Sequence, residues 1–153
     1  MSILEVIKEP NKILRKKSQK ITEITPELRQ LVLDMAQTMK KIDGIGLAAP
    51  QIGKNIRLII ISTEKGPLTL FNPVITWKSL RTEIEEEGCL SCINKTGQVK
   101  RSKIIYVKAL NENNNELAFR AAGLFARVIQ HEVDHLDGIL ITDKFTNKKR
   151  QSE

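Results

Sequence analysis

Two histidines and a glutamate near the end of the chain form the pattern with the clearest chemistry. His131 and His135 are the only histidines in the sequence, and Glu132 follows the first of them. Residues i and i+4 lie above one another on one face of a helix, so both imidazoles can bind the same metal ion. Glu132 is then placed to take a proton from a metal-bound water. The pattern therefore predicts a catalytic metal site on a helix.

A catalytic metal site needs a third protein ligand and a further position that stays open for water. A third histidine six residues after His135 would complete one known pattern, but Ile141 occupies that position. Few acidic residues follow the helix, so we expect the third ligand upstream. Cys89 is the best candidate, because a thiolate is a strong ligand and the chain has only two cysteines.

Cys89 and Cys92 also form a Cys-x-x-Cys pair, which leaves two other interpretations. A thioredoxin-like redox motif is disfavoured, because the negative charges of the acidic run 85–87 oppose formation of a thiolate. A structural zinc site built from both cysteines and both histidines is the stronger alternative. Such a site would be closed and non-catalytic, and it would leave Glu132 without a role.

The segment Gly44-Ile45-Gly46-Leu47-Ala48-Ala49 satisfies the G-x-G-x-x-G/A dinucleotide fingerprint. That fingerprint follows a strand and opens a helix, whereas this segment follows an expected helix and runs into Pro50, which disfavours a helix. We interpret it either as a glycine turn or as an exposed backbone edge to which a peptide can add as a strand. In the second case Gln51 would point an amide donor at a carbonyl group.

Two helices are expected to frame these motifs. Thr25 is a suitable N-cap and Pro26 suits the first helical position, and apolar residues then recur at helical spacing up to Asp43. The second helix is expected over Ala121–Leu136 and carries the His-Glu-x-x-His motif. Because Leu124 and Val128 continue the face of the two histidines, we expect this whole face of the helix to be buried.

Runs of β-branched and apolar residues predict strands between the two helices. They are Ile56–Ser62, two short pieces within Leu68–Trp77 that Asn72-Pro73 interrupts, one strand over Gln98–Leu110, and a return strand over Glu116–Arg120. Because these strands do not alternate with helices, the order indicates an α+β fold. The basic tail Lys148-Lys149-Arg150 is expected to fray.

Length and composition fit one globular domain, with 153 residues, 41% hydrophobic and 28% charged. The apolar runs are too short for a membrane helix, and charged residues stand where a signal peptide needs an apolar region, so we expect a cytoplasmic protein without membrane contact. An aromatic content of 4% disfavours base stacking and sequence-specific nucleic-acid binding. The net charge of +7 is compatible with contact to a polyanion such as the ribosome.

Three segments, taken in order, resemble the signatures of the peptide deformylase family. The signatures are Gly-x-Gly-Leu-Ala-Ala-x-Gln, Glu-Gly-Cys-Leu-Ser and Gln-His-Glu-x-x-His, and this chain has them at 44–51, 87–91 and 130–135. The resemblance covers nearly the whole of 1–153 and implies a single catalytic domain. It implies small mixed or antiparallel sheets packed around a central helix that carries the His-Glu-x-x-His motif.

The resemblance implies a hydrolase that removes the formyl group from the N-terminal formylmethionine of new polypeptides and releases formate. It makes Cys89, His131 and His135 the metal ligands and Glu132 the catalytic acid and base. The implied ion is a single divalent metal, Fe(II) in the cell, which Zn, Ni or Co can replace. The implied partners are formylmethionyl nascent peptides, with a transient ribosome contact through the basic surface.

Further residues are implied to contact the substrate. Gln51 and the backbone N–H of Leu90 match the donors that stabilise the oxyanion. The backbone at Ile45 and Gly46, with Gly44 before it, matches the edge that holds the substrate peptide. Val128 is expected in the pocket for the methionine side chain.

The chain departs from the family pattern after Glu-Gly-Cys-Leu-Ser, where an aliphatic residue and a proline are usual and Cys92-Ile93 stand here. This departure places a second thiol close to the expected metal. Two other functions remain open on the sequence. One is a metallopeptidase that uses the same helix, and the other is a non-enzymatic, zinc-stabilised module that binds RNA through its positive charge.

Overall fold

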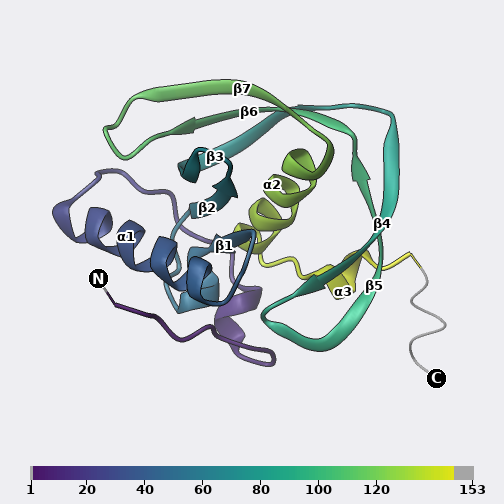
Figure 1. Cartoon of the computed structure of the whole chain (residues 1–153), viewed down its shortest axis with the longest axis horizontal. Helices are drawn as coiled ribbons and strands as arrows, with labels where there is room; N and C mark the ends of the chain where they lie inside the picture. Colours follow the sequence, from purple (N-terminus) through teal and green to yellow (C-terminus); the bar gives the residue numbers. More distant parts are fainter. Residues whose placement is uncertain (1, 147–153) are drawn as a thin grey trace.

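The computed structural model describes residues 2–146, and Figure 1 shows their arrangement around a central helix. Helix α2 (Gly123–Leu136) lies between a five-stranded sheet and a separate two-stranded hairpin. The sheet is antiparallel in the order β1-β2-β3-β6-β7, with bounds Gly46–Ala48, Leu58–Thr63, Gly66–Lys78, Ile104–Leu110 and Glu116–Ala122. The hairpin consists of β4 (Thr82–Cys89) and β5 (Cys92–Ser102), and the short α3 (Ile141–Lys144) packs on β5. The predicted α+β class and the central helix are therefore confirmed.

Strand β2 separates the two helices, which explains its continuous apolar sequence. Ile59 and Ile61 belong to the core cluster that includes residues of α2, whereas Leu58 and Ile60 belong to the cluster that includes Met35 of α1 (Pro26–Lys41). All four β2 side chains are buried because each face of the strand is covered by a helix. The position of α2 is thus set from one side by β2.

Both predicted helices form, with small differences at their ends. Thr25 caps α1 by accepting a hydrogen bond from the Leu28 N–H at 3.2 Å, and the helix ends at Lys41. Helix α2 begins at Gly123 because the two residues before it, 121–122, pair with β6 as part of β7. It ends at Leu136, followed by Gly138 with a positive φ of 72°.

The strand predictions were wrong in three places. Asn72-Pro73 does not break the strand, because a register shift between Phe71 and Val74 absorbs the proline within a continuous β3. The predicted strand 98–110 is two strands, since the chain leaves the hairpin at Ser102 and enters the sheet at Ile104. Strand β4 was missed because its side chains are mostly exposed and charged, so it lacks an apolar alternation.

Within residues 2–146, no helix is long and apolar enough to cross a membrane. The basic tail that the sequence predicts to fray, Lys148-Lys149-Arg150, lies outside the described residues.

Candidate active site

Three possible metal-ligand atoms converge between α2 and the end of β4. The ligand atoms of Cys89, His131 and His135 all lie within 4.8 Å of one another, and Cys89 Sγ is 3.3 Å from His135 Nε2. The two histidines lie one turn apart on α2, and the end of the hairpin brings Cys89 to them. The structure thus brings together the three ligands that the sequence suggests, although Cys89 is more than forty residues away from the two histidines in the chain.

Glu87 orients one of the two histidines. Its Oε1 is 3.0 Å from Nδ1 of His131, which leaves Nε2 of that ring to face the cluster. A carboxylate bound to the far nitrogen of a histidine is the usual support for a metal ligand, because it fixes the ring and its tautomer. From the sequence, Glu87 was considered for its charge and as part of the Glu-Gly-Cys-Leu-Ser signature, but not as a support for a metal ligand. Glu87 lies two residues before Cys89, and residues two apart on a strand point to the same face. This spacing could have placed Glu87 near the metal ligands from the sequence alone.

Two buried arginines compensate the charge of Glu87. Arg101 donates from Nε and Nη2 to the two carboxylate oxygens at 3.0 Å each, and Arg127 donates to Oε2. Burial favours a higher pKa for Glu87, but hydrogen bonds from His131 and Arg101 outweigh it and hold the pKa well below its ordinary value. Glu87 is therefore ionised, and its charge is neutralised locally rather than directed at Cys89.

Glu132 is buried beside the cluster with an unpaired oxygen. Its Oε1 and the Nδ1 of His135 have no hydrogen-bond partner among residues 2–146. Burial raises the pKa of Glu132 to about 7 and lowers that of His135 well below its ordinary value, so His135 is a neutral imidazole. A thiol, two imidazoles and a nearby unpaired carboxylate oxygen form a donor set that fits a divalent transition metal with an open position.

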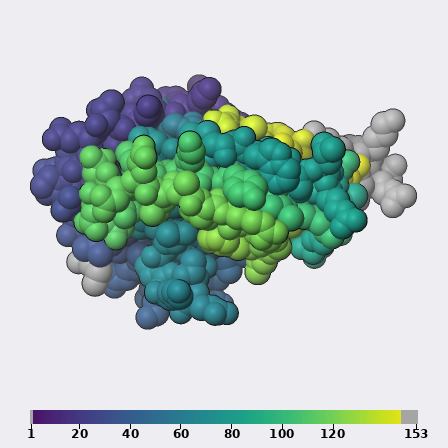
Figure 2. All heavy atoms as spheres, turned by 90° about the horizontal axis from the view of Figure 1, so that it is seen from above, coloured from purple at the N-terminus to yellow at the C-terminus, as the bar shows by residue number. Residues whose placement is uncertain are grey.

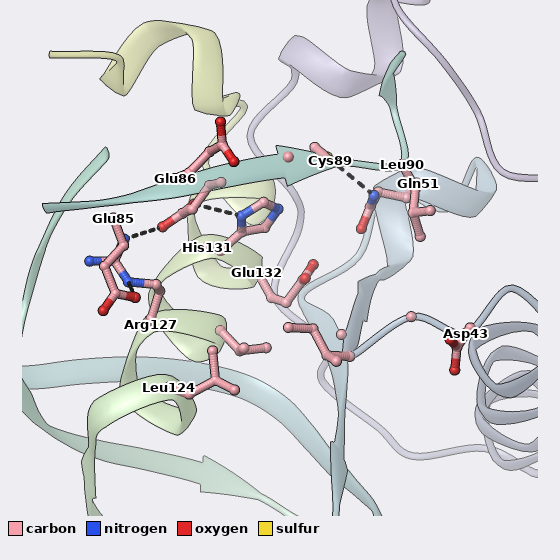
Figure 3. A pocket seen from close by; sticks show the side chains of 16 residues that line it. Asp43, Gln51, Glu85, Glu86, Cys89, Leu90, Leu124, Arg127, His131 and Glu132 are labelled. Carbon is pink, nitrogen blue, oxygen red and sulfur yellow. Dashed lines mark hydrogen bonds and ion pairs between the residues drawn. The ribbon is translucent and has the colours of Figure 1, made fainter. Parts of the chain in front are cut away.

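Gln51 lies across the site from α2, as Figure 3 shows. Its Oε1 accepts a hydrogen bond from the Ala48 N–H at 3.0 Å, and this contact fixes the direction of the amide group. Its Nε2 lies 3.2 Å from Ser91 Oγ and 3.8 Å from Cys89 Sγ. The buried Ser91, which sequence analysis did not single out, also donates to the Ile7 carbonyl and thereby ties the N-terminal segment to the site.

Strand β1 is an edge strand whose free side borders the site. The Ser62 N–H donates to the Ile45 carbonyl at 2.9 Å, so residues 45 and 62 are a hydrogen-bonded pair across β1 and β2. Because such pairs alternate, the N–H and C=O of Gly46 point away from β2, toward the cavity. Of the three residues expected to hold a peptide, Gly46 thus offers backbone groups, whereas the Ile45 carbonyl is already paired.

A cavity of about 560 Å³ connects these groups. Its lining includes Gly44, Ile45 and Gly46 on one side, Leu90 and Cys89 on another, and Val128 and Leu124 of α2. Val128 is 6% exposed, as expected, but the expectation that Leu124 is buried was wrong, since it is 64% exposed. Leu124 lies at the first turn of α2, beyond the covering strands, and it forms part of the cavity wall instead.

The alternative of a closed zinc site does not match the cluster. Cys92 is not part of the donor group found among residues 2–146, and it is buried in an apolar cluster with Leu14, Val99 and Leu140. With three protein ligands rather than four, the geometry favours an open, catalytic site.

Comparison with known proteins identifies the family of this chain. A model of the polypeptide deformylase family matches residues 3–151. The chain belongs to the polypeptide deformylase family. It is 44% identical to the peptide deformylase of Thermodesulfovibrio yellowstonii over 99% of this chain and 94% of that protein. It is 43% identical to peptide deformylase 1 of Clostridium acetobutylicum over 97% of this chain and 99% of that one.

Solved structures of deformylases have the same fold. The crystal structure of the Thermotoga maritima peptide deformylase superposes with a TM-score of 0.93 at 36% identity, covering 95% of this chain and 99% of that one. The Synechococcus elongatus peptide deformylase in complex with actinonin also gives a TM-score of 0.93, at 41% identity over 97% of this chain and 82% of that one. The likeness therefore extends over nearly the whole chain.

Proposed function

We propose that the cavity beside β1 removes the formyl group from the N-terminal formylmethionine of new polypeptides and releases it as formate. The observation that carries this proposal is the convergence of Cys89, His131 and His135 on one point beside Glu132 and a free sheet edge. Membership of the polypeptide deformylase family supports the same reaction. The enzyme is a metal-dependent hydrolase that acts on a linear amide.

The substrate peptide binds along β1 as an added strand. The outward N–H and C=O of Gly46 pair with the peptide backbone, which aligns the N-terminal residue with the cluster. The buried Val128 and the exposed Ile45 and Leu124 line the cavity and offer an apolar surface to the methionine side chain.

Cys89, His131 and His135 hold one divalent metal ion, and Glu87 fixes the ring of His131 for that purpose. When bound, the ion supplies a Lewis acid and makes water a better nucleophile at neutral pH. We propose Fe(II) as the ion in the cell, on the family resemblance and the mixed sulfur and nitrogen donor set, which Zn, Ni or Co also fits. Metal analysis of protein purified without oxygen tests this assignment.

Glu132 moves the proton in this reaction. Its unpaired Oε1 takes a proton from the attacking water and delivers it to the amine that leaves. The Gln51 Nε2 and the Leu90 N–H stabilise the negative charge that develops on the formyl oxygen. One such donor lowers the barrier by about 3 kcal/mol.

The test compares formylated and unformylated peptides of one sequence. We expect the metal-loaded protein to release formate from the formylmethionyl peptide and to leave the unformylated peptide intact. Removal of the metal with a chelator abolishes release, and adding the metal back restores it. Cleavage of internal amide bonds in the unformylated peptide would favour the metallopeptidase alternative and contradict the proposal.

We further propose a transient contact with the ribosome through the outer face of β6 and β7, which places the enzyme in the cytoplasm beside emerging chains. Lys108 and Arg120 are exposed there, next to Trp77 and Tyr106, whose rings are 5.5 Å apart. Green atoms of this hairpin cover much of the face seen in Figure 2. Cationic groups on one open face suit the phosphates of ribosomal RNA.

Ribosome co-sedimentation at increasing salt tests this contact. Lys108→Glu with Arg120→Glu is expected to weaken ribosome binding. The same charge change on α1, Lys40→Glu with Lys41→Glu, is expected to weaken it less. Equal weakening by both pairs would contradict a contact specific to β6 and β7.

A further inference from the structure

Cys92 is a reactive side chain that the proposed reaction does not use. It is 2% exposed and packs with Leu14, Val99 and Leu140. A thiol in such a place is chemically inert unless another group can reach it. Its neighbour Cys89 is such a group.

The two cysteines face one another across the end of the β4–β5 hairpin. Cys89 is the register partner of Cys92, and Leu90 and Ser91 form the turn between them. Directly opposite residues of antiparallel strands have Cα atoms about 4.5 to 5.5 Å apart, within the range of about 4.4 to 6.8 Å found for disulfides. The hairpin can therefore accept a bond between them with little backbone movement.

The two thiols differ in access from solvent. Cys89 is partly exposed and lines the cavity, whereas Cys92 is closed off behind it. A small oxidant that enters the cavity meets Cys89 first, and the oxidised sulfur then has Cys92 as its nearest thiol. This is the arrangement of an attacked thiol and a resolving thiol.

We propose that Cys92 is a resolving cysteine that captures peroxide-oxidised Cys89 as a reversible Cys89–Cys92 disulfide. In the first step the Cys89 sulfur attacks a peroxide oxygen, the O–O bond breaks, and Cys89 becomes a sulfenic acid while water leaves. In the second step the Cys92 sulfur attacks the sulfenic sulfur and a second water leaves. The two thiols lose two electrons and two protons in total, and one hydrogen peroxide becomes two waters.

The disulfide has two consequences for the site. It withdraws the Cys89 thiolate from the metal, so the ion is released. This consequence rests on the proposed metal site, whereas formation of the disulfide does not. It also stops oxidation before the sulfinic acid, which thiol reductants do not reverse. Cys92 thus converts permanent damage at a metal ligand into a reversible off state.

The test uses the zinc-loaded protein, because zinc has no redox chemistry of its own. Hydrogen peroxide is added in small excess, zinc release is followed with a coloured chelator, and intact mass and peptide mapping identify the product. We expect the wild type to lose two hydrogen atoms, to release its zinc, and to rebind zinc after treatment with dithiothreitol. The matched variant Cys92→Val keeps an apolar side chain in the cluster. We expect it to gain oxygen atoms on Cys89 and not to recover.

Three results would overturn the proposal. One is a wild type that accumulates sulfinic acid on Cys89 as fast as Cys92→Val does. Another is a disulfide that joins two separate chains instead of Cys89 and Cys92. Should Cys92→Val fail to fold, the wild-type peptide map decides alone. Cys89 and Cys92 lie in one tryptic peptide, 82–95, and the proposal is rejected if this peptide does not lose two hydrogen atoms on peroxide treatment. A disulfide that forms while zinc stays bound would reject the release step and the ligand role of Cys89. The resolving role of Cys92 would still be supported by that result.

Discussion

Gly46 and Glu132 approach so closely that a side chain at position 46 would have to displace the glutamate. A Cβ atom built there would lie 2.7 Å from Glu132 Oε2 and 2.9 Å from Val128 Cγ1. This contact is where the edge strand β1 meets the helix that carries the candidate base. It therefore fixes the distance between the substrate strand and the group that moves the proton.

The substitution Gly46→Ala is expected to displace Glu132 and lower turnover about a hundredfold, because small misplacements of a catalytic group cost that much. Steady-state formate release measures the loss. Gly44→Ala is the comparison, since its nearest neighbours are side-chain carbons at 3.5 Å or more, and its loss should be much smaller. Similar losses in both variants would contradict the steric argument.

Glu132→Gln is expected to lower formate release at least about a hundredfold while the metal content stays unchanged. The amide keeps the size of the side chain but cannot take a proton. Because burial at this position disfavours the charged carboxylate, the neutral amide should not destabilise the fold. Turnover equal to that of the wild type, with metal bound, would remove Glu132 from the mechanism.

Gln51→Leu removes one proposed donor to the formyl oxygen, and we expect the turnover number to fall about a hundredfold, equivalent to about 3 kcal/mol, with little change in KM. Ser91→Ala is the control, because it removes a contact of Gln51 Nε2 while the Ala48 N–H still holds Oε1. Its effect should be clearly smaller. A change confined to KM in Gln51→Leu would indicate a substrate-binding role instead.

Glu87→Gln removes the buried carboxylate that Arg101 and Arg127 share, and it leaves Arg101 with Asp134 and Arg127 with the exposed Glu85. We expect the free energy of unfolding, measured with denaturant, to fall by about 3 to 5 kcal/mol. We also expect metal binding to become at least about tenfold weaker. Glu85→Gln on the same strand is the matched control. The Glu85 side chain is 56% exposed where that of Glu87 is 6% exposed, so we expect a loss of at most about 1 kcal/mol. Equal losses would show that the buried network does not stabilise the fold.

Local patterns were sufficient for the features whose physics is local. The spacing of His131 and His135 depends only on helical periodicity, and the cap at Thr25 only on neighbouring residues. The same local reasoning missed β4, because its exposed charged side chains do not show an apolar alternation. It was also wrong for Leu124, which continues a buried helix face but is itself exposed. Burial depends on what packs against a residue, and a single segment does not contain that information.

The amino-acid sequence by itself determined the chemistry available to this protein: two imidazoles one turn apart, a carboxylate between them and a scarce thiol. Only the tertiary structure decided that these groups meet, that Glu87 is neutralised by Arg101 and Arg127, and that Gly46 turns its backbone toward them. The reason is that each of these relationships joins segments far apart in the chain. Their distances are set by the packing of α2 between the sheet and the hairpin, which is a property of the whole core.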